Sequence, residues 1–169
     1  YEVKDPAVIS QLVELVTKEG TSPRTEFVGK SAKYILDKIG ITVGDDVKVI
    51  LMEAKEDHPF VQVELMMPIL PLVRVPDVDQ AIEMAVRVEH GNRHTAMMHS
   101  RNVEKLTKMA KLIQTTIFVK NGPSYAGIGV GGEGYTTFTI AGPTGEGLTS
   151  AKSFARRRRC VLVGGMDVR

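Results

Sequence analysis

The chain has 169 residues, of which 22 are basic and 20 acidic, so its formal net charge is +2. Hydrophobic residues make up 43% and charged residues 25%, which excludes a disordered chain. The near-neutral charge gives no support for nucleic-acid binding. A single cysteine, Cys160, excludes an intramolecular disulfide framework and a multi-cysteine zinc site, and favours the reducing cytosol. The apolar runs are far too short to span a bilayer, so we expect no membrane partner.

The first part of the chain is predicted to form two helices and then two strands. Asp5 and Pro6 are typical of a helix start, and apolar residues recur at helical spacing from there until Gly20. A second helix and two apolar runs of β type follow, at residues 31–39, 47–52 and 69–75.

Helices and strands then alternate regularly. Helices are predicted at residues 77–91, 103–114 and 149–158, and strands at residues 95–99, 116–120, 136–140 and 160–163. Strands that alternate with helices of about ten residues favour β-α-β units. The sequence therefore predicts one α/β domain with a mainly parallel sheet flanked by helices.

Two glycine-rich stretches suggest phosphate chemistry. Gly127, Gly129 and Gly132 have the G-x-G-x-x-G spacing of a dinucleotide fingerprint, but residues 135–140 after them are typical of a strand instead of a helix. We therefore favour a mobile, closely packed active-site or interface loop. Residues 142–147 resemble a phosphate loop without its lysine; we interpret them as a turn into a helix, with weak anion binding at that helix start as the alternative.

Histidines and the cysteine are further candidates for chemistry. His90 and His94 are four residues apart, as metal ligands on one helical face are, but Gly91 interrupts the helix and no carboxylate or cysteine completes a set. We therefore predict no metal site and prefer a loop histidine that lines a cleft or is simply hydrogen-bonded. Cys160 follows four arginines but opens an apolar strand, which favours a buried small hydrophobe over a catalytic thiolate.

Charged residues supply two weaker signals. The arginines at residues 156–159 suit phosphate binding, but basic residues at a helix C-terminus are also favoured by the helix dipole and form ion pairs at interfaces. Glu64 lies inside an apolar stretch just before a predicted strand. A buried carboxylate is costly unless it is paired or hydrogen-bonded, so Glu64 is a modest functional candidate.

Four segments carry a family resemblance: HPFVQVELMMPILPLVRV, GNRHTAMMHSRN, TTIFVKNGPSYAGIGVGGEGYTTFTIAGPTGEG and SFARRRRCVLV. They closely resemble the C-terminal part of CoA-acylating aldehyde dehydrogenases, especially the acetaldehyde and propionaldehyde dehydrogenases of ethanolamine and propanediol utilisation in bacterial microcompartments. The resemblance implies that residues 1–155 are a portion of the catalytic domain and residues 156–169 a connection towards the oligomerisation strand. It also implies that the NAD-binding domain is absent from this chain.

The resemblance assigns a cofactor contact to two residues. In the family a cysteine attacks the aldehyde to give a thiohemiacetal, hydride passes to NAD, and the resulting thioester is transferred to coenzyme A. Glu64 matches the glutamate of an E-x-F-G-P-like motif, which hydrogen-bonds the ribose on the nicotinamide side. Pro68 is the retained proline of that motif, whereas Met66 and Met67 replace its Phe-Gly, as is expected for the acylating subgroup.

The resemblance also assigns substrate contacts. Ser124, Tyr125 and Ile128 belong to the loop that lines the aldehyde pocket, and His94 and Thr95 match a segment near the mouth of the active site.

Cys160 does not inherit the catalytic role, because it aligns near the family's C-terminal end while the nucleophilic cysteine lies upstream. This chain is therefore expected to lack the nucleophile, to be inactive on its own, and to bind neither NAD nor coenzyme A tightly. The parent enzyme is expected to take a short-chain aldehyde and coenzyme A, to form a homo-oligomer, and to lie in the cytoplasm inside a microcompartment, in possible contact with its shell. The alternative hypothesis is a non-catalytic binding or assembly module that docks on a full-length enzyme or a shell.

Overall fold

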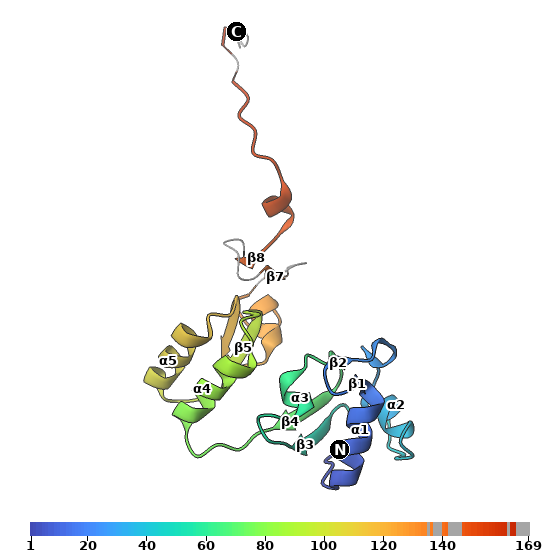
Figure 1. The fold of residues 1–169 in the computed structure, drawn as a ribbon. Coiled ribbons are helices and arrows are strands. Elements are labelled where there is room, and N and C mark those ends of the chain that lie inside the picture. The colour runs from blue at the N-terminus through green and yellow to red at the C-terminus, as the bar shows by residue number, and fades with distance from the viewer. Residues whose placement is uncertain (135, 137–139, 142–146, 162, 165–169) are drawn as a thin grey trace. The chain divides into compact units, whose positions relative to one another are not determined.

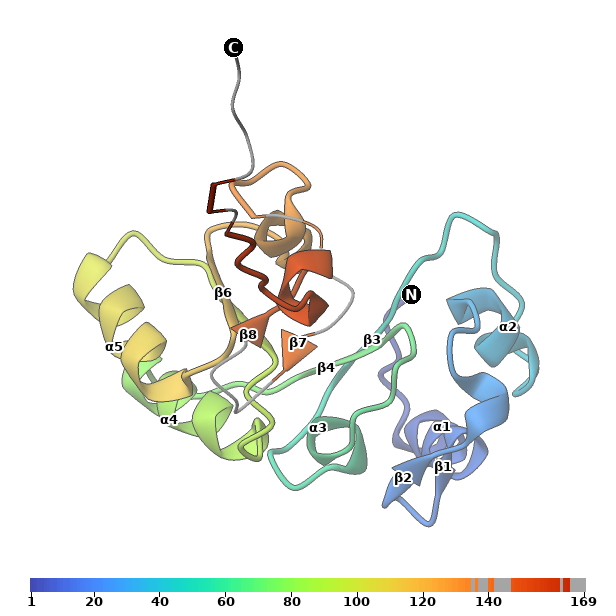
Figure 2. The ribbon, with the colours of Figure 1, turned by 90° about the horizontal axis from the view of Figure 1, so that it is seen from above.

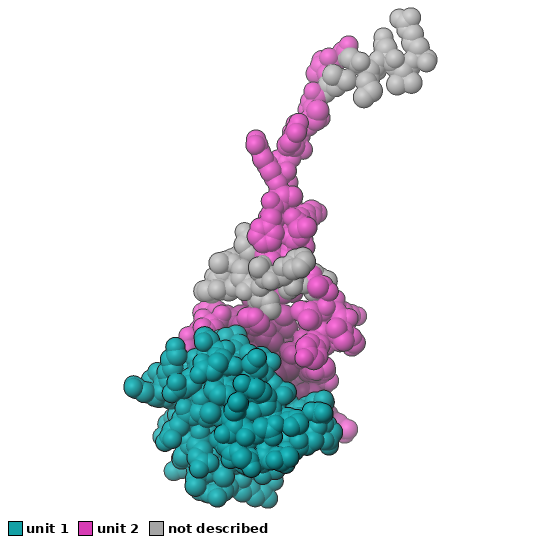
Figure 3. Space-filling view, turned by 90° about the vertical axis from the view of Figure 1, so that its right-hand side faces the viewer, with its two compact units in different colours: residues 1–88 teal, residues 89–169 magenta. Residues whose placement is uncertain are grey.

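The computed structural model describes residues 1–134, 136, 140–141, 147–161 and 163–164. The chain divides into two compact units, residues 1–88 and residues 89–169, which Figure 3 colours separately. Each unit is described by itself below.

Unit 1 begins with two capped helices (Figure 1). Helix α1 (Pro6–Val16) starts where the Asp5 carboxylate accepts a hydrogen bond from the Ala7 amide at 2.8 Å. It ends four residues before Gly20, because the Thr17 hydroxyl donates to the Val13 carbonyl at 2.6 Å and accepts from the Gly20 amide. The chain then turns through the antiparallel pair β1 (Thr17–Lys18) and β2 (Ser22–Pro23), the 3₁₀ turn η1 (Thr25–Phe27) and helix α2 (Ala32–Asp37).

Two parallel strands form the sheet of unit 1. Strand β3 (Ile50–Glu53) pairs with β4 (Ile69–Leu72), with Ile50 opposite Ile69, and the short helix α3 (Pro59–Gln62) connects them. An isolated parallel bridge joins Glu2 to Leu51 on the other edge of β3. Side chains from the first two helices and β3 pack together, and six of them have no exposed surface: Leu12, Val16, Ile35, Leu36, Ile50 and Met52.

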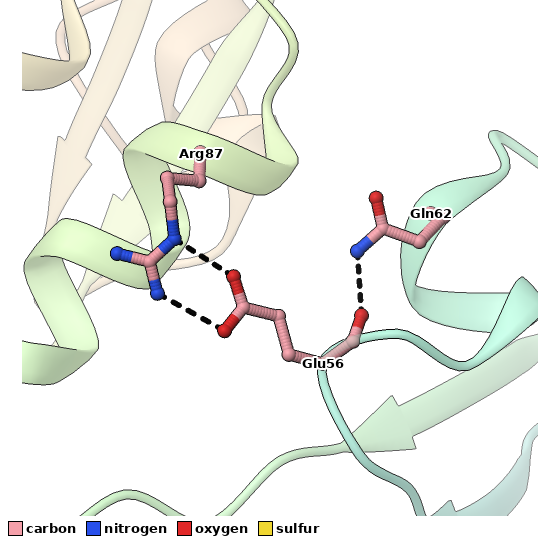
Figure 4. A network of polar contacts seen from close by, with 3 residues as sticks. All are labelled: Glu56, Gln62 and Arg87. Carbon is pink, nitrogen blue, oxygen red and sulfur yellow. Dashed lines mark hydrogen bonds and ion pairs between the residues drawn. The ribbon is translucent and has the colours of Figure 1, made fainter.

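Helix α4 (Val78–Val88) completes unit 1. The Asp77 carboxylate accepts a hydrogen bond from the Gln80 amide at 2.9 Å, as predicted for the start of this helix. Near its end, Arg87 forms a bidentate ion pair with Glu56, with Nε–Oε1 at 2.8 Å and Nη2–Oε2 at 3.0 Å (Figure 4). Gln62 donates to the carbonyl of Glu56. Glu56, which follows β3, is thus bonded to both α3 and α4.

Unit 2 contains the second parallel pair. Strand β5 (Thr95–Met98) pairs with β6 (Ile117–Lys120), and the two are connected through helix α5 (Val103–Ile113). The 3₁₀ helix η2 (Ser124–Ile128) follows β6, and Figure 2 shows α5 and η2 on opposite sides of this pair. Both longer strand pairs are parallel and flanked by helices, which confirms the predicted α/β class with mainly parallel strands.

The C-terminal segment departs from the prediction. Strand β7 (Ile140–Ala141) pairs antiparallel with β8 (Gly147–Leu148), and the 3₁₀ helix η3 (Ala151–Phe154) follows. The helix predicted at residues 149–158 is wrong, because Ala155 is extended and residues 155–161 have no regular structure. Every residue from 151 to 161 is exposed, so a helix there would bury no apolar face to stabilise it. Among the described residues of the predicted strand 160–163, none is in a strand.

Candidate functional site

A cavity of about 520 Å³ lies in unit 1 beside the segment that precedes β4. Met66 has a left-handed backbone with φ of 53°, and its carbonyl accepts a hydrogen bond from the Gly29 amide at 3.1 Å. The Pro68 carbonyl accepts from the Ile50 amide at 2.8 Å, which fixes the same segment to the sheet. The cavity therefore has one wall from Met66 to Pro68 and another from the start of α2.

The charged side chains that line this cavity are mainly cations. Lys30, Lys33 and Lys48 line it together with one carboxylate, Asp45. Lys33 also forms an ion pair with Asp37 at 2.8 Å, and this hydrogen bond and charge raise the pKa of Lys33. Lys48 donates to the Asp45 backbone carbonyl at 2.6 Å, and the Lys30 ammonium lies 5.5 Å from the centre of the Tyr34 ring. Even with Asp37 counted, these lysines and carboxylates carry a net positive charge, which suits an anionic ligand such as a phosphate or pyrophosphate with its ribose.

The two predicted cofactor residues are placed differently. Pro68 lines the cavity, so its position agrees with a binding wall. Glu64 is exposed on the link between α3 and β4 and is not among the lining residues. The sequence interpretation of Glu64 as a carboxylate within an apolar stretch is therefore wrong about its burial. The neighbouring Leu65 is buried instead and packs in the core of unit 1.

The lysines of the cavity were missed by the sequence reasoning. Their one visible signal is the run Gly29-Lys30-Ser31, which precedes a further lysine at residue 33. Lysines on a short surface helix are ordinary, however, and only the fold brings Lys48 and the Met66–Pro68 segment to the same cavity.

The predicted aldehyde-contact residues all lie in unit 2. Ser124, Tyr125 and Ile128 belong to η2, which follows the carboxyl end of β6. Ser124 and Ile128 are half-buried, while Tyr125 is exposed over 63% of its surface. Side chains on such a turn after a parallel strand are well placed to contact a ligand.

His94 and Thr95 lie at the amino end of β5. His94 Nδ1 is 2.6 Å from the Thr95 hydroxyl, and the His94 carbonyl accepts from the Ile117 amide at 3.1 Å. Thr95 is opposite Ile117 in the strand register, and Gly127 of η2 packs directly on the Ile117 side chain. The loop after β6 thus returns over the sheet towards the end where Thr95 lies.

The glycine-rich loop is closely packed, as predicted. A Cβ atom on Gly132 would lie 2.7 Å from the Ala126 Cβ and 2.8 Å from its carbonyl oxygen. A Cβ on Gly127 would overlap Ile117, and one on Gly134 would overlap the carbonyl of Gly127. The glycines therefore serve close approach of two backbone segments, and no described residue from 129 to 134 is helical. Residues 135, 137–139 and 142–146 of the other predicted motifs lie outside the described residues.

Cys160 is exposed, so its predicted burial is wrong. It lies in the segment after η3, in which all residues from 155 to 161 are exposed. Within the described part of the chain, no three histidine, cysteine or acidic side chains are grouped so that they could hold a metal ion. None of the described helices is long and apolar enough to cross a membrane.

Comparison with known proteins finds similarity to aldehyde dehydrogenases, both in a family model and in individual relatives. The model of the aldehyde dehydrogenase family matches residues 47–145. A propanal dehydrogenase (CoA-propanoylating) of Salmonella typhimurium is 51% identical over 165 residues, which are 97% of this chain and 35% of that protein. An acetaldehyde dehydrogenase (acetylating) of the same organism is 53% identical over 150 residues, 89% of this chain and 32% of that protein. The chain thus spans about a third of the length of these relatives.

Solved structures agree with the sequence comparison. The propionaldehyde dehydrogenase of Rhodopseudomonas palustris, crystallised with bound CoA and an acylated cysteine, is 72% identical with a TM-score of 0.89 over 96% of this chain and 37% of that one. An engineered glycolyl-CoA reductase with bound NADP⁺ is 70% identical, with a TM-score of 0.89 over 100% of this chain and 38% of that one. A propionaldehyde dehydrogenase from the fucose utilisation microcompartment of Clostridium phytofermentans is 48% identical, with a TM-score of 0.86 over 100% and 38%.

Proposed function

The chain belongs to the aldehyde dehydrogenase family, and we propose that it forms part of an enzyme that converts a short-chain aldehyde to its acyl-CoA. The observation that carries the proposal is the 72% identity to a propionaldehyde dehydrogenase that binds CoA and carries an acylated cysteine. Overall, aldehyde, coenzyme A and an oxidised nicotinamide cofactor give acyl-CoA, the reduced cofactor and a proton. The relatives span both propanal and acetaldehyde, so the proposed substrate class is a two- or three-carbon aldehyde.

The cavity of unit 1 is proposed to hold part of the cofactor. Its lysines fit the anionic groups of a dinucleotide or of coenzyme A, and Pro68 and Met66 supply a wall against which a ribose can pack. These lysines and the Met66–Pro68 wall would hold the cofactor, and a nicotinamide held there would supply an acceptor for hydride. The relative with bound NADP⁺ supports a nicotinamide dinucleotide, and Glu64 remains a proposed contact because its exposed carboxylate can turn towards a ribose.

The turn after β6 is proposed to contact the aldehyde. Ile128 and Thr95 are half-buried and present apolar or weakly polar surface, which suits a short alkyl chain. Ser124 adds a hydroxyl that can hydrogen-bond a carbonyl oxygen. Tyr125 of the same turn and His94 at the amino end of β5 are exposed, and we propose them as rim residues. This chain would then supply binding and orientation, and a cysteine outside it would supply the nucleophile.

The proposal extends to assembly and location. One relative comes from a bacterial microcompartment, which supports a cytoplasmic enzyme enclosed in such a compartment. The exposed segment with Arg156 to Arg159, followed by exposed Val161 and Val163, suits a connection that pairs with another copy of the enzyme. We therefore propose a homo-oligomer.

Assaying this chain and the complete protein that contains it in parallel tests the function. With propanal, coenzyme A and NAD⁺, the complete protein should form propionyl-CoA. Its Cys160→Ala variant should retain full turnover, because Cys160 lies in the exposed segment after η3 and the proposed nucleophile is another cysteine. This chain alone should give no turnover above background. Turnover by this chain that disappears in Cys160→Ala would contradict the placement of the nucleophile. A complete protein that turns over no aldehyde would favour the non-catalytic assembly module.

The cavity is tested by removing two of its cations. In the complete protein, Lys30→Ala combined with Lys33→Ala should raise the Kd for NAD⁺ by about tenfold, because two ammonium groups that face the cofactor's anionic oxygens are lost. Lys38→Ala is the matched control, since Lys38 lies over the Tyr34 ring as Lys30 does, but it follows the C-terminal end of α2 and does not line the cavity. Calorimetry measures both values. An equal change in the two variants contradicts the cavity as the cofactor site.

A further inference from the structure

Asn121 makes a two-point contact that ties the ends of the two strands of unit 2 together. Its side-chain oxygen accepts a hydrogen bond from the Ser100 amide at 2.7 Å, and its side-chain nitrogen donates to the Ser100 carbonyl at 2.9 Å. Its own amide donates to the Met98 carbonyl at 2.9 Å. One residue beyond the end of β6, the Asn121 side chain thus makes the two hydrogen bonds to Ser100 that the backbone of a paired strand would otherwise make.

The residue at this position must satisfy two requirements. Asn121 has a left-handed backbone with φ of 56°, which glycine and asparagine adopt most readily. Its side chain must also donate and accept at the same time, which an amide can do and an ionised carboxylate cannot. Asparagine meets both requirements, glycine meets only the first, and aspartate meets the first and half of the second.

The chain from Asn121 to η2 is short and closely constrained. A Cβ on Gly122 would lie 3.3 Å from the Val119 side chain, so this residue has little room to move. After η2, the Ala126 carbonyl accepts from the amides of Gly129 at 3.3 Å and Gly134 at 3.2 Å. Only Gly122 and Pro123 separate Asn121 from η2. We therefore expect a displacement of Asn121 to displace η2 as well.

We propose that Asn121 is the positioning residue of the aldehyde-contact turn, residues 124–128. By holding both backbone groups of Ser100, it fixes where Ser124 and Ile128 lie relative to β5, and so sets the affinity for the aldehyde without touching it. The inference rests on the proposed function, since it is the aldehyde that the turn is expected to contact.

Steady-state kinetics of the complete protein test the proposal through separate KM values. Asn121→Gly should raise the KM for propanal about tenfold and leave the KM for NAD⁺ and for coenzyme A within twofold, because only the aldehyde turn shifts. Asn121→Asp keeps the acceptor and should fall between Asn121→Gly and the wild type. Lys120→Gln changes an exposed neighbour and should match the wild type. A uniform rise of all three KM values, or no rise for propanal, overturns the proposal.

Hydrogen exchange separates this inference from the proposed function. In Asn121→Gly, peptides that cover residues 98–101 and 122–134 should exchange faster than in the wild type, while α5 should be unchanged. If the wild-type protein turns over no aldehyde, the proposed function fails. The exchange rates of the turn still report whether Asn121 positions it. Unchanged exchange in residues 122–134 overturns the positioning role in either case.

Discussion

The two units of the chain are held together in different ways. In unit 1, six large side chains are completely inaccessible, and helices α1 and α2 contribute four of them. The buried hydrophobic side chains described in unit 2 keep 4–8% of their surface exposed: Leu106, Met109, Ile113, Ile117 and Val119. Unit 2 also has close contacts of Gly132 and Gly134 with the backbone of residues 126 and 127, and the side-chain amide of Asn121 bonds to the Ser100 backbone.

This difference matches the proposed roles of the two units. Side-chain packing defines a stable scaffold but tolerates small shifts, because neighbouring side chains can rearrange. Contacts between backbone atoms leave the two segments little freedom to move. Such contacts join Gly132 and Gly134 to residues 126 and 127 of η2, the turn whose Ser124 and Ile128 are proposed to contact the aldehyde. Unit 1 offers instead a broad cavity lined by long, flexible lysines, which suits an extended and charged cofactor.

Gly132→Ala is expected to have the largest effect on this contrast. The new methyl group would lie 2.8 Å from the Ala126 carbonyl oxygen, so backbone has to move, and we expect unit 2 to lose about 1–3 kcal/mol of stability. Gly131→Ala is the matched control, since a methyl group there meets nothing within 4 Å and the cost is the strain of a left-handed alanine, about 1 kcal/mol. Denaturant unfolding followed by hydrogen exchange assigns each loss to a unit.

Two outcomes would break the comparison. An equal loss in Gly132→Ala and Gly131→Ala would mean that backbone conformation, and not close approach, explains the glycines. Faster exchange in residues 1–88 of Gly132→Ala would mean that the two units do not differ in what holds them together.

The sequence predicted well the helix starts at Asp5, Asp77 and Asn102, because their signals are local. It also located the four longer strands, β3 to β6, but the strand predicted at residues 160–163 is wrong. Asp5, Asp77 and Asn102 each accept a hydrogen bond from an amide in the first turn of the helix that was predicted to follow. Helix ends were predicted less well. Thr17 ends α1 early through its hydroxyl, and the exposed segment after η3 had an apolar pattern but nothing to pack against.

The candidate site could be predicted only in part. The family motif indicated Pro68, and the structure places it at a cavity. Lys48 belongs to the same cavity but is far away in the sequence, so no spacing rule connects it to Lys30 or Lys33. Asn121 was missed because its role depends on Ser100, 21 residues away on the neighbouring connection. Contacts of this kind appear only when the register of two strands is known.

His58 gives the smallest expected effect, and it distinguishes the units by pH. Its Nδ1 accepts a hydrogen bond from the Phe60 amide at 3.1 Å, which caps α3, and partial burial lowers its pKa although Asp57 nearby acts in the opposite direction. The unfolded chain therefore binds a proton more readily than unit 1 does. Above the pKa of about 6.5 that His58 has in the unfolded chain, its titration costs no unfolding free energy. Stability falls as the pH drops from this value to the lower pKa of the folded chain.

His58→Asn removes this titration and keeps a cap, because an asparagine oxygen can accept from the same amide. Between about pH 7.5 and about pH 5, the wild type should lose more unfolding free energy than the variant does. The lowered pKa values of Glu53, Glu56 and Asp77 keep those carboxylates out of this window. His90→Asn replaces an exposed histidine of unit 2 and should retain the wild-type pH dependence. If His90→Asn flattens the dependence of unfolding free energy on pH and His58→Asn does not, the titrating residue lies in unit 2, and the assignment to His58 is wrong.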